Sequence, residues 1–188
     1  MTTTEIEKYF SELNDGLKKI GIIGEMYLFG GAVMCLALKS RVSTKDIDAV
    51  FEPKDKIYEI AKEISESNGL QKDWINDAVK GFLSDKGEFS EYSEMSNLRV
   101  FTAVPEYVLS MKCMSMRIGE SEDVEDVKFL LKHLSIKSQN ELMELISKYY
   151  REENLPQKTF YAIQEIFEQL LQDNNGNDFQ NSDIGLSR

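Results

Sequence analysis

The sequence predicts an α+β fold, with a small β-sheet in the first part of the chain and only helices in the rest. Apolar stretches with strand character lie at 22–29, 47–51 and 98–104, and helical patterns separate them. After residue 104, four amphipathic helical patterns follow one another with no strand between them. The same order of elements also suits an α/β unit followed by helices.

Three helices are expected before residue 104. In the first, apolar side chains recur at helical spacing and Gly21 can end the helix. The expected helices cover 2–20, 32–39 and 54–67. The stretch 71–83 suits a short helix or an ordered loop. The polar composition of 85–96 favours an exposed loop.

The rest of the chain is helical in pattern until its polar end. The expected helices cover 106–118, 121–134, 138–150 and 156–171. From Asp173 onward Asn, Asp, Ser and Gly prevail, which predicts a disordered tail. We therefore divide the chain into a core over 1–104, a helical region over 105–172 and a tail over 173–188.

The composition limits the functions that the chain can have. Its net charge is −11, with 22 basic against 33 acidic residues. Proteins bind long nucleic acids through many Lys and Arg contacts, so this charge argues against a broad nucleic-acid groove. A single nucleotide is not excluded, because a metal ion and a few cations can neutralise its charge locally.

Cysteine and histidine are too few for several kinds of site. Cys35 and Cys113 lie in apolar helical patterns, which favours buried free thiols. His133 is the only histidine, which argues against a catalytic triad and, with two cysteines, against a zinc site. There is no signal peptide and no apolar run of about eighteen residues, so we expect a cytoplasmic protein without a membrane partner.

Gly30 and Gly31 follow a short apolar strand and precede a helix. Glycine allows a positive φ and a close approach of a ligand to the main chain, and the N–H groups at the start of a helix favour phosphate. In most proteins two glycines mark only a turn. Neither a P-loop nor a dinucleotide fingerprint is present, because the residues that complete those motifs are missing.

Asp46 and Asp48 lie at the strand predicted over 47–51. Residues i and i+2 of a strand face the same side, so the two carboxylates should project together from Cα atoms about 6.5–7 Å apart. Carboxylates in this arrangement can share one or two Mg²⁺ ions. An Asp-x-Asp alone is usually a solvated strand end. A phosphate-binding turn followed by such a pair is what transfer of a nucleotidyl group requires.

These glycines and aspartates, with Arg41 and Thr44 between them, resemble the signature of the polymerase-β-like nucleotidyltransferase superfamily. The most similar branch is that of the minimal bacterial nucleotidyltransferases, which is related to abortive-infection and toxin–antitoxin enzymes. The resemblance implies a small mixed sheet flanked by helices. It also implies that the glycine pair, Arg41 and Thr44 bind the nucleotide and that the two aspartates bind metal.

A second motif of the same resemblance follows the strand at 98–104. It consists of a proline-led helix with a lysine, then an arginine, then Asp-x-x-Asp. The matching residues are Pro105, Glu106, Leu109, Lys112, Arg117, Asp123 and Asp126. The resemblance implies catalytic roles for Lys112 and Asp123 and places Asp126 at the nucleotide. Glu122 replaces the basic residue that typically precedes the Asp-x-x-Asp.

The residues of the second motif also have ordinary structural readings. Lys112 lies in an apolar stretch, so its amine can point inward to a phosphate, or the side chain can bury its stem and reach solvent. Asp123 and Asp126 share a helix face and equally suit a solvated first turn. The strand at 98–104 has no carboxylate, although strands in this position often carry the last metal ligand in the superfamily.

The sequence therefore predicts an enzyme that transfers a nucleoside monophosphate from an NTP to an acceptor hydroxyl, with Mg²⁺, or else Mn²⁺, as cofactor. The acceptor is a protein, a small molecule or a tRNA, and the negative charge favours the first two. A cognate antitoxin or another partner protein is expected. The alternatives are a catalytically silent nucleotide- or partner-binding module, and a phosphatase or nuclease that uses the same carboxylates.

Overall fold

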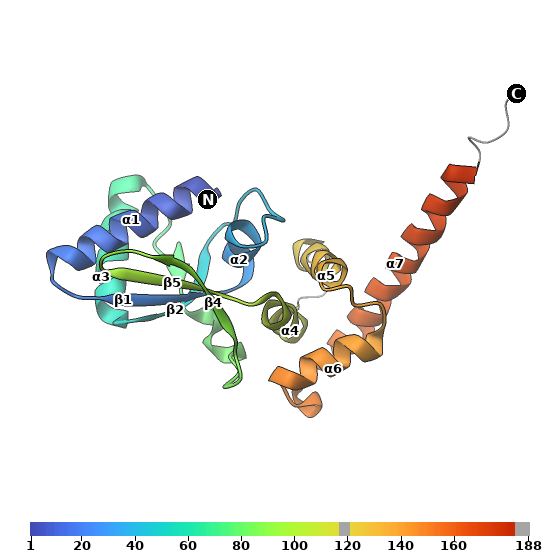
Figure 1. The fold of residues 1–188 in the computed structure, drawn as a ribbon. Helices are drawn as coiled ribbons and strands as arrows, with labels where there is room; N and C mark the ends of the chain where they lie inside the picture. The colour runs from blue at the N-terminus through green and yellow to red at the C-terminus, as the bar shows by residue number, and fades with distance from the viewer. Residues whose placement is uncertain (117–120, 183–188) are drawn as a thin grey trace, which may run out of the picture.

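The computed structural model describes residues 1–116 and 121–182, and it contains a five-stranded sheet in the order β3-β2-β1-β5-β4 (Figure 1). β1 (Gly24–Leu28) runs antiparallel to β2 (Ile47–Glu52) and parallel to β5 (Leu98–Ala103). The short β3 (Ile75–Asn76) pairs in parallel with β2, and β4 (Phe89–Glu94) pairs antiparallel with β5. The expected α+β fold with a mixed sheet is confirmed.

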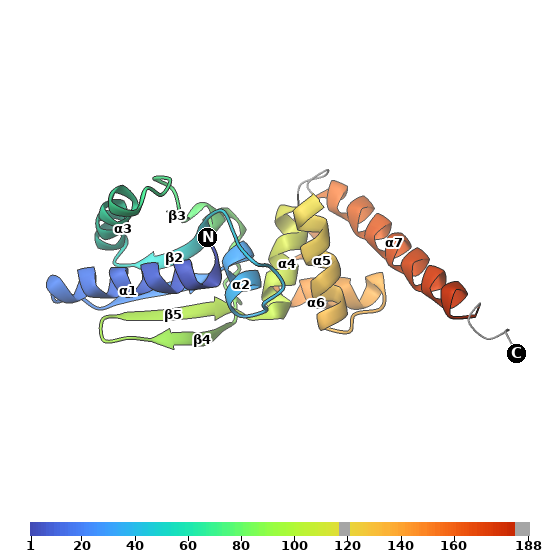
Figure 2. The same cartoon turned by 90° about the horizontal axis from the view of Figure 1, so that it is seen from above.

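Two helices cover one face of this sheet. α1 (Thr3–Lys19) and α3 (Lys54–Asn68) pack against each other over the strands (Figure 2). In β1 and β2 buried residues alternate with half-exposed ones, so the face under α1 and α3 is the core side. The opposite face is partly open to solvent, and Asp48 lies on it.

The helical region continues from the end of β5 and stands beside the sheet (Figures 1 and 2). It consists of α4 (Pro105–Ser115), α5 (Ser121–His133), α6 (Gln139–Tyr149) and α7 (Gln157–Ser182). β1 and β5 end at the same edge of the sheet, and β2, which is antiparallel to β1, begins there. This edge therefore collects the segment after β1, the segment before β2 and the start of α4.

The polar segment 85–96, which we expected to be an exposed loop, contains strand β4. β4 is an edge strand that pairs on one side only, so its Ser and Glu side chains can stay in solvent. Phe89 and Tyr92 are half-buried against the core, with a register irregularity between Glu91 and Ser93. A polar composition was therefore the wrong basis for assigning a loop here.

Other boundaries also differ from those expected. α2 (Gly30–Leu36) begins at the glycine pair rather than after it, and 71–83 forms β3 and the short 3-10 helix η1 (Ala78–Phe82). α7 continues to Ser182, although we expected disorder from Asp173. Asn and Asp lower helix propensity but do not prevent elongation of a helix that has already formed. Positions 183–188 lie outside the described residues.

Both cysteines are free and buried, as expected. Burial raises the pKa of the Cys113 thiol to about 12, and burial also raises the pKa of Cys35. In the described part of the chain, no helix is both long enough and apolar enough to cross a membrane.

Neither thiol should react with the reagent DTNB in the folded protein at neutral pH. The thiolate is the reactive form, and burial both raises the pKa and blocks access. Titration in native buffer should detect no fast-reacting thiol, whereas titration in guanidinium chloride should detect both. Rapid reaction of either thiol in native buffer would contradict the packing described above.

Candidate active site

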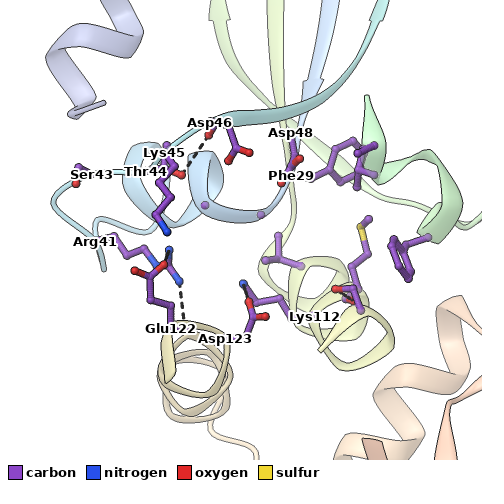
Figure 3. Close-up of a pocket in the computed structure, with 18 of the residues that line it drawn as sticks. Phe29, Arg41, Ser43, Thr44, Lys45, Asp46, Asp48, Lys112, Glu122 and Asp123 are labelled. Carbon is purple, nitrogen blue, oxygen red and sulfur yellow. Dashed lines mark hydrogen bonds and ion pairs between the residues drawn. The ribbon is translucent and has the colours of Figure 1, made fainter. Parts of the chain in front are cut away.

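A cavity of about 540 Å³ lies at the edge of the sheet where β1 ends and β2 begins (Figure 3). Its volume falls within the range of ligand pockets, roughly 300–1,000 Å³. Of the predicted site residues, those that line it are Gly30, Gly31, Arg41, Thr44, Asp46, Asp48, Lys112 and Asp123. The fold thus brings the first motif together with two residues of the second.

The glycine pair forms the turn into α2. Gly30 has a φ of 53°, which favours glycine, and a Cβ there would lie 3.1 Å from Oδ2 of Asp48. A Cβ on Gly31 would lie 2.3 Å from Oγ1 of Thr44, which is too close for any real contact. α2 has only seven residues, so the turn offers main-chain N–H groups rather than a strong helix dipole.

The two aspartates are held by their main chains at the start of β2. Asp46 immediately precedes the strand instead of lying in it, and its carbonyl oxygen accepts a 3.1 Å hydrogen bond from the Thr44 hydroxyl. The Asp48 carbonyl accepts a 2.9 Å hydrogen bond from the Phe29 N–H. Figure 3 shows both carboxylates on the cavity side of this segment. Asp46 is exposed and Asp48 is half-buried.

This pair has the donor chemistry of a magnesium site. Among the described residues, no group of three or more His, Cys, Asp or Glu side chains is placed to hold a metal ion. Mg²⁺ nevertheless commonly binds through one or two carboxylates, with water and substrate phosphates as its other ligands. Asp46 and Asp48 therefore fit a magnesium ion that is shared with a bound phosphate group.

Lys112 reaches the cavity from α4 and points inward. Its side chain is 11% exposed, which decides against a surface lysine. Its Nζ lies 3.2 Å from Oδ1 of Asp123 and 2.6 Å from Oδ2 of Asp126. Lys112 and Asp123 thus form an ion pair within the cavity wall, and both side chains line the cavity.

Asp126 occupies a different position from the one expected of a nucleotide-binding residue. It is 4% exposed and does not belong to the cavity wall. Its carboxylate accepts two hydrogen bonds of 2.7 Å from Nε and Nη2 of Arg41, in addition to the contact with Lys112. Both carboxylate oxygens of Asp126 are thus in contact with Arg41 or Lys112. Asp126 therefore positions these two cations of the site.

Arg41 links the loop before β2 to the start of α5. Besides Asp126, it donates hydrogen bonds to Oε2 of Glu122 at 3.3 Å and to the Glu122 carbonyl at 3.1 Å. Burial by itself would lower the pKa of the guanidinium, but the hydrogen bonds and charge of Asp126 outweigh it and the pKa is raised. Arg41 stays charged and is held by the protein's own carboxylates.

Sequence reasoning missed two parts of the site. Lys45 lines the cavity and makes no ion pair with any residue that the structure describes. Its place between Thr44 and Asp46 was the available signal. An apolar wall of the cavity is formed by Ala78, Val79 and Phe82 of η1. The sequence did not predict this wall, because the pattern of 71–83 suits a short helix and an ordered loop equally well. Arg117 of the second motif lies outside the described residues.

A family model matches residues 4–171. The chain belongs to the family DUF6036, described as a nucleotidyltransferase of unknown function. The DUF6036 match includes every predicted site residue and extends from α1 into α7, so it covers both the core and the helical region. No curated protein and no solved structure matched the chain.

Gly31→Ala should destabilise the protein by about 1–3 kcal/mol, because the new Cβ overlaps the buried Thr44 hydroxyl. It should also displace the Asp46 main chain, which that hydroxyl holds. Urea denaturation measures the first effect. Gly81→Ala is the control, since a Cβ at Gly81 meets no atom within 4 Å. Adding Thr44→Ala to Gly31→Ala should recover part of the loss. Equal stability of the Gly31 and Gly81 variants would contradict the close packing.

Asp126→Asn should cost about 3–5 kcal/mol in free energy of unfolding, because it removes the charge of a buried carboxylate that two partly buried cations share. The neighbouring Glu125→Gln is the matched control. Glu125 is 71% exposed and, among the described residues, pairs with Lys128, so its loss should change stability by less than about 0.5 kcal/mol. Chemical denaturation of both variants makes the comparison. If Asp126→Asn lowers the free energy of unfolding no more than Glu125→Gln does, the contacts of Asp126 with Arg41 and Lys112 do not stabilise the fold.

Proposed function

We propose that this protein is a Mg²⁺-dependent nucleotidyltransferase that moves a nucleoside monophosphate from an NTP to an acceptor hydroxyl. One observation carries the proposal: the carboxylate pair, the glycine turn and Lys112 line a single cavity although they come from separate parts of the chain. Membership of a family described as a nucleotidyltransferase supports the same class of reaction.

Each part of the cavity has a task in this reaction. When bound, Mg²⁺ would be held by Asp46 and Asp48 and would neutralise charge on the phosphates. The main chain of the Gly30–Gly31 turn can approach the phosphates closely, because neither residue has a side chain. Among the described side chains of the wall, Lys45 is the cation most available to the triphosphate, since Arg41 and Lys112 are paired with carboxylates.

The chemistry is a substitution at the α-phosphorus. The acceptor oxygen forms a bond to the α-phosphorus. The bond between the α-phosphorus and the oxygen that bridges the α- and β-phosphates breaks, and pyrophosphate leaves with the electron pair of that bond. The acceptor's proton passes to a carboxylate of the pair. Lys112 and Lys45 stabilise the negative charge that develops on the leaving group, which is the kind of fixed electrostatic contact that contributes most to such rates.

The acceptor belongs to the same proposal. A protein or a small molecule is favoured over tRNA, because the net charge of −11 disfavours a long polyanion. A role in toxin–antitoxin or phage-defence systems, with a cognate antitoxin as partner, rests on the motif resemblance. Growth arrest on expression in a bacterial host, abolished by Asp48→Asn, would support that role.

A second candidate is a nucleotide-binding module without turnover. The observation in its favour is that the described residues offer two clustered carboxylates and no third metal ligand. Such a module would bind an NTP in the presence of Mg²⁺ and release no pyrophosphate. Measuring binding and pyrophosphate release on the same sample distinguishes the two candidates.

Asp46→Asn and Asp48→Asn should each reduce NTP-dependent labelling by at least about 100-fold, the size of effect expected when one electrostatic contact to a transition state is lost. Each substitution keeps the side-chain size and removes a charge that binds Mg²⁺. The assay follows transfer of label from α-phosphate-labelled NTPs to components of a cell extract, with and without Mg²⁺.

Glu52→Gln is the matched control, because Glu52 is an exposed carboxylate at the opposite end of the same strand. It should label like the wild type. Circular dichroism of all variants checks that the fold is intact. If the Asp48 variant labels as fast as the Glu52 variant, the metal role of Asp48 is wrong.

A further inference from the structure

The cavity has two ends of different character. Figure 3 shows the charged side chains of Arg41, Lys45 and Glu122 on one side of the cavity and Phe29 on the other. Asp48 and Lys112 lie between these two sides. The apolar part of the wall comes from Phe29 before α2, from η1, which packs against β2 and α4, and from α4 itself. Its side chains are those of Phe29, Ala78, Val79, Phe82, Val108 and Met111.

Part of this apolar wall is exposed, and part of it is core. Phe29 and Val108 are each 1% exposed, so they form a fixed floor. Phe82, in contrast, is 40% exposed, and Val79 is half-buried. An isolated exposed apolar residue is ordinary on a protein surface. Here, however, the exposed side chains continue a buried apolar surface into a cavity, which is the usual construction of a ligand site.

η1 is fastened at both of its ends, so this wall has a defined position. At its start, the Asp77 carboxylate contacts Nζ of Lys54 and of Lys80 at 2.7 Å, and the hydroxyl of Tyr58 at 2.9 Å. These contacts, the Lys54 hydrogen bond above all, hold the pKa of Asp77 well below its usual range, so its charge persists.

The end of η1 is tied to the helical region. The Tyr150 hydroxyl donates a 2.6 Å hydrogen bond to the Phe82 carbonyl, and the Ser84 N–H donates a 2.8 Å hydrogen bond to the Tyr107 hydroxyl. Phe82 is thus presented to the cavity by a segment held from α3 on one side and from α4 and the end of α6 on the other. A rigid apolar surface loses little conformational entropy when it binds a flat ring.

We propose that this apolar end, with Phe82 as its main contact, binds the nucleobase of the NTP. The inference rests on the function proposed above, because it needs the triphosphate at the carboxylate pair. A nucleotide joins a charged triphosphate to a base whose flat faces can stack on apolar and aromatic side chains, and the cavity offers both a charged and an apolar surface. Stacking of a base on an aromatic side chain contributes about 1–3 kcal/mol, and every base has a face that can stack.

The test compares two neighbouring side chains. Phe82→Ala removes the proposed contact. Leu83→Ala is the matched control: Leu83 is 39% exposed, against 40% for Phe82, but it faces a different hollow, beside Ser84 and Tyr149. Val79→Ala is a smaller change on the same wall. It serves as the second variant if Phe82→Ala lowers the midpoint of thermal unfolding.

The ligands are the α,β-methylene analogues of the four NTPs, which cannot transfer a nucleotidyl group, and inorganic tripolyphosphate, which has no base. Calorimetry with excess Mg²⁺ measures each dissociation constant. Phe82→Ala should weaken binding of the analogues about tenfold, the lower part of the stacking range, and leave tripolyphosphate binding unchanged. Val79→Ala should act in the same direction with a smaller loss, and Leu83→Ala should affect neither ligand.

Several results would overturn the inference. Unchanged analogue binding by both Phe82→Ala and Val79→Ala would do so, as would an equal loss for the analogues and for tripolyphosphate. Unchanged analogue binding with slower transfer to an acceptor would assign the apolar end to the acceptor instead. If the wild type binds neither the analogues nor tripolyphosphate, the proposed function itself fails, and the inference fails with it.

Discussion

The carboxylate of Asp126 is the contact on which the rest of the site depends. It joins Arg41, from the loop before β2, to Lys112 of α4, and it does so from α5 in an almost completely buried position. Buried charges are costly unless they are paired, so these three side chains are stable together and unstable separately. Arg41 and Lys112 are therefore ordered only when the helical region is packed against the sheet, and the site belongs to neither part alone.

Sheet topology explains why this packing produces a site at all. β1 and β5 are parallel and end at one edge, whereas β2 is antiparallel to β1 and begins there. The glycine turn leaves β1 at that edge, the aspartates enter β2 there, and α4 leaves β5 there. Two motifs that are distant in sequence meet because three strand ends coincide, and the hydrogen bonds of Thr44 and Phe29 fix the main chain at the meeting point.

The parts that could be predicted from sequence are those with a local signal. The apolar spacing of α1, the glycine pair and the Asp-x-Asp each lie within a few residues, and the α+β class follows from their order. β4 was missed because an edge strand carries polar side chains like a loop. The position of Asp126 could not be foreseen, since its partners lie in other elements. The roles of the site residues stay predictions until the variants are measured.

The side chains around the cavity also determine the form in which an anionic ligand can enter. The wall carries the cations Arg41, Lys45 and Lys112 against the carboxylates Asp46, Asp48, Glu122 and Asp123, so its side chains have a net negative charge. A triphosphate that already carries a divalent cation would meet two carboxylates, Asp46 and Asp48, able to complete the coordination of that cation. Under the function proposed above, the cavity should therefore favour the ion–nucleotide pair over the nucleotide alone.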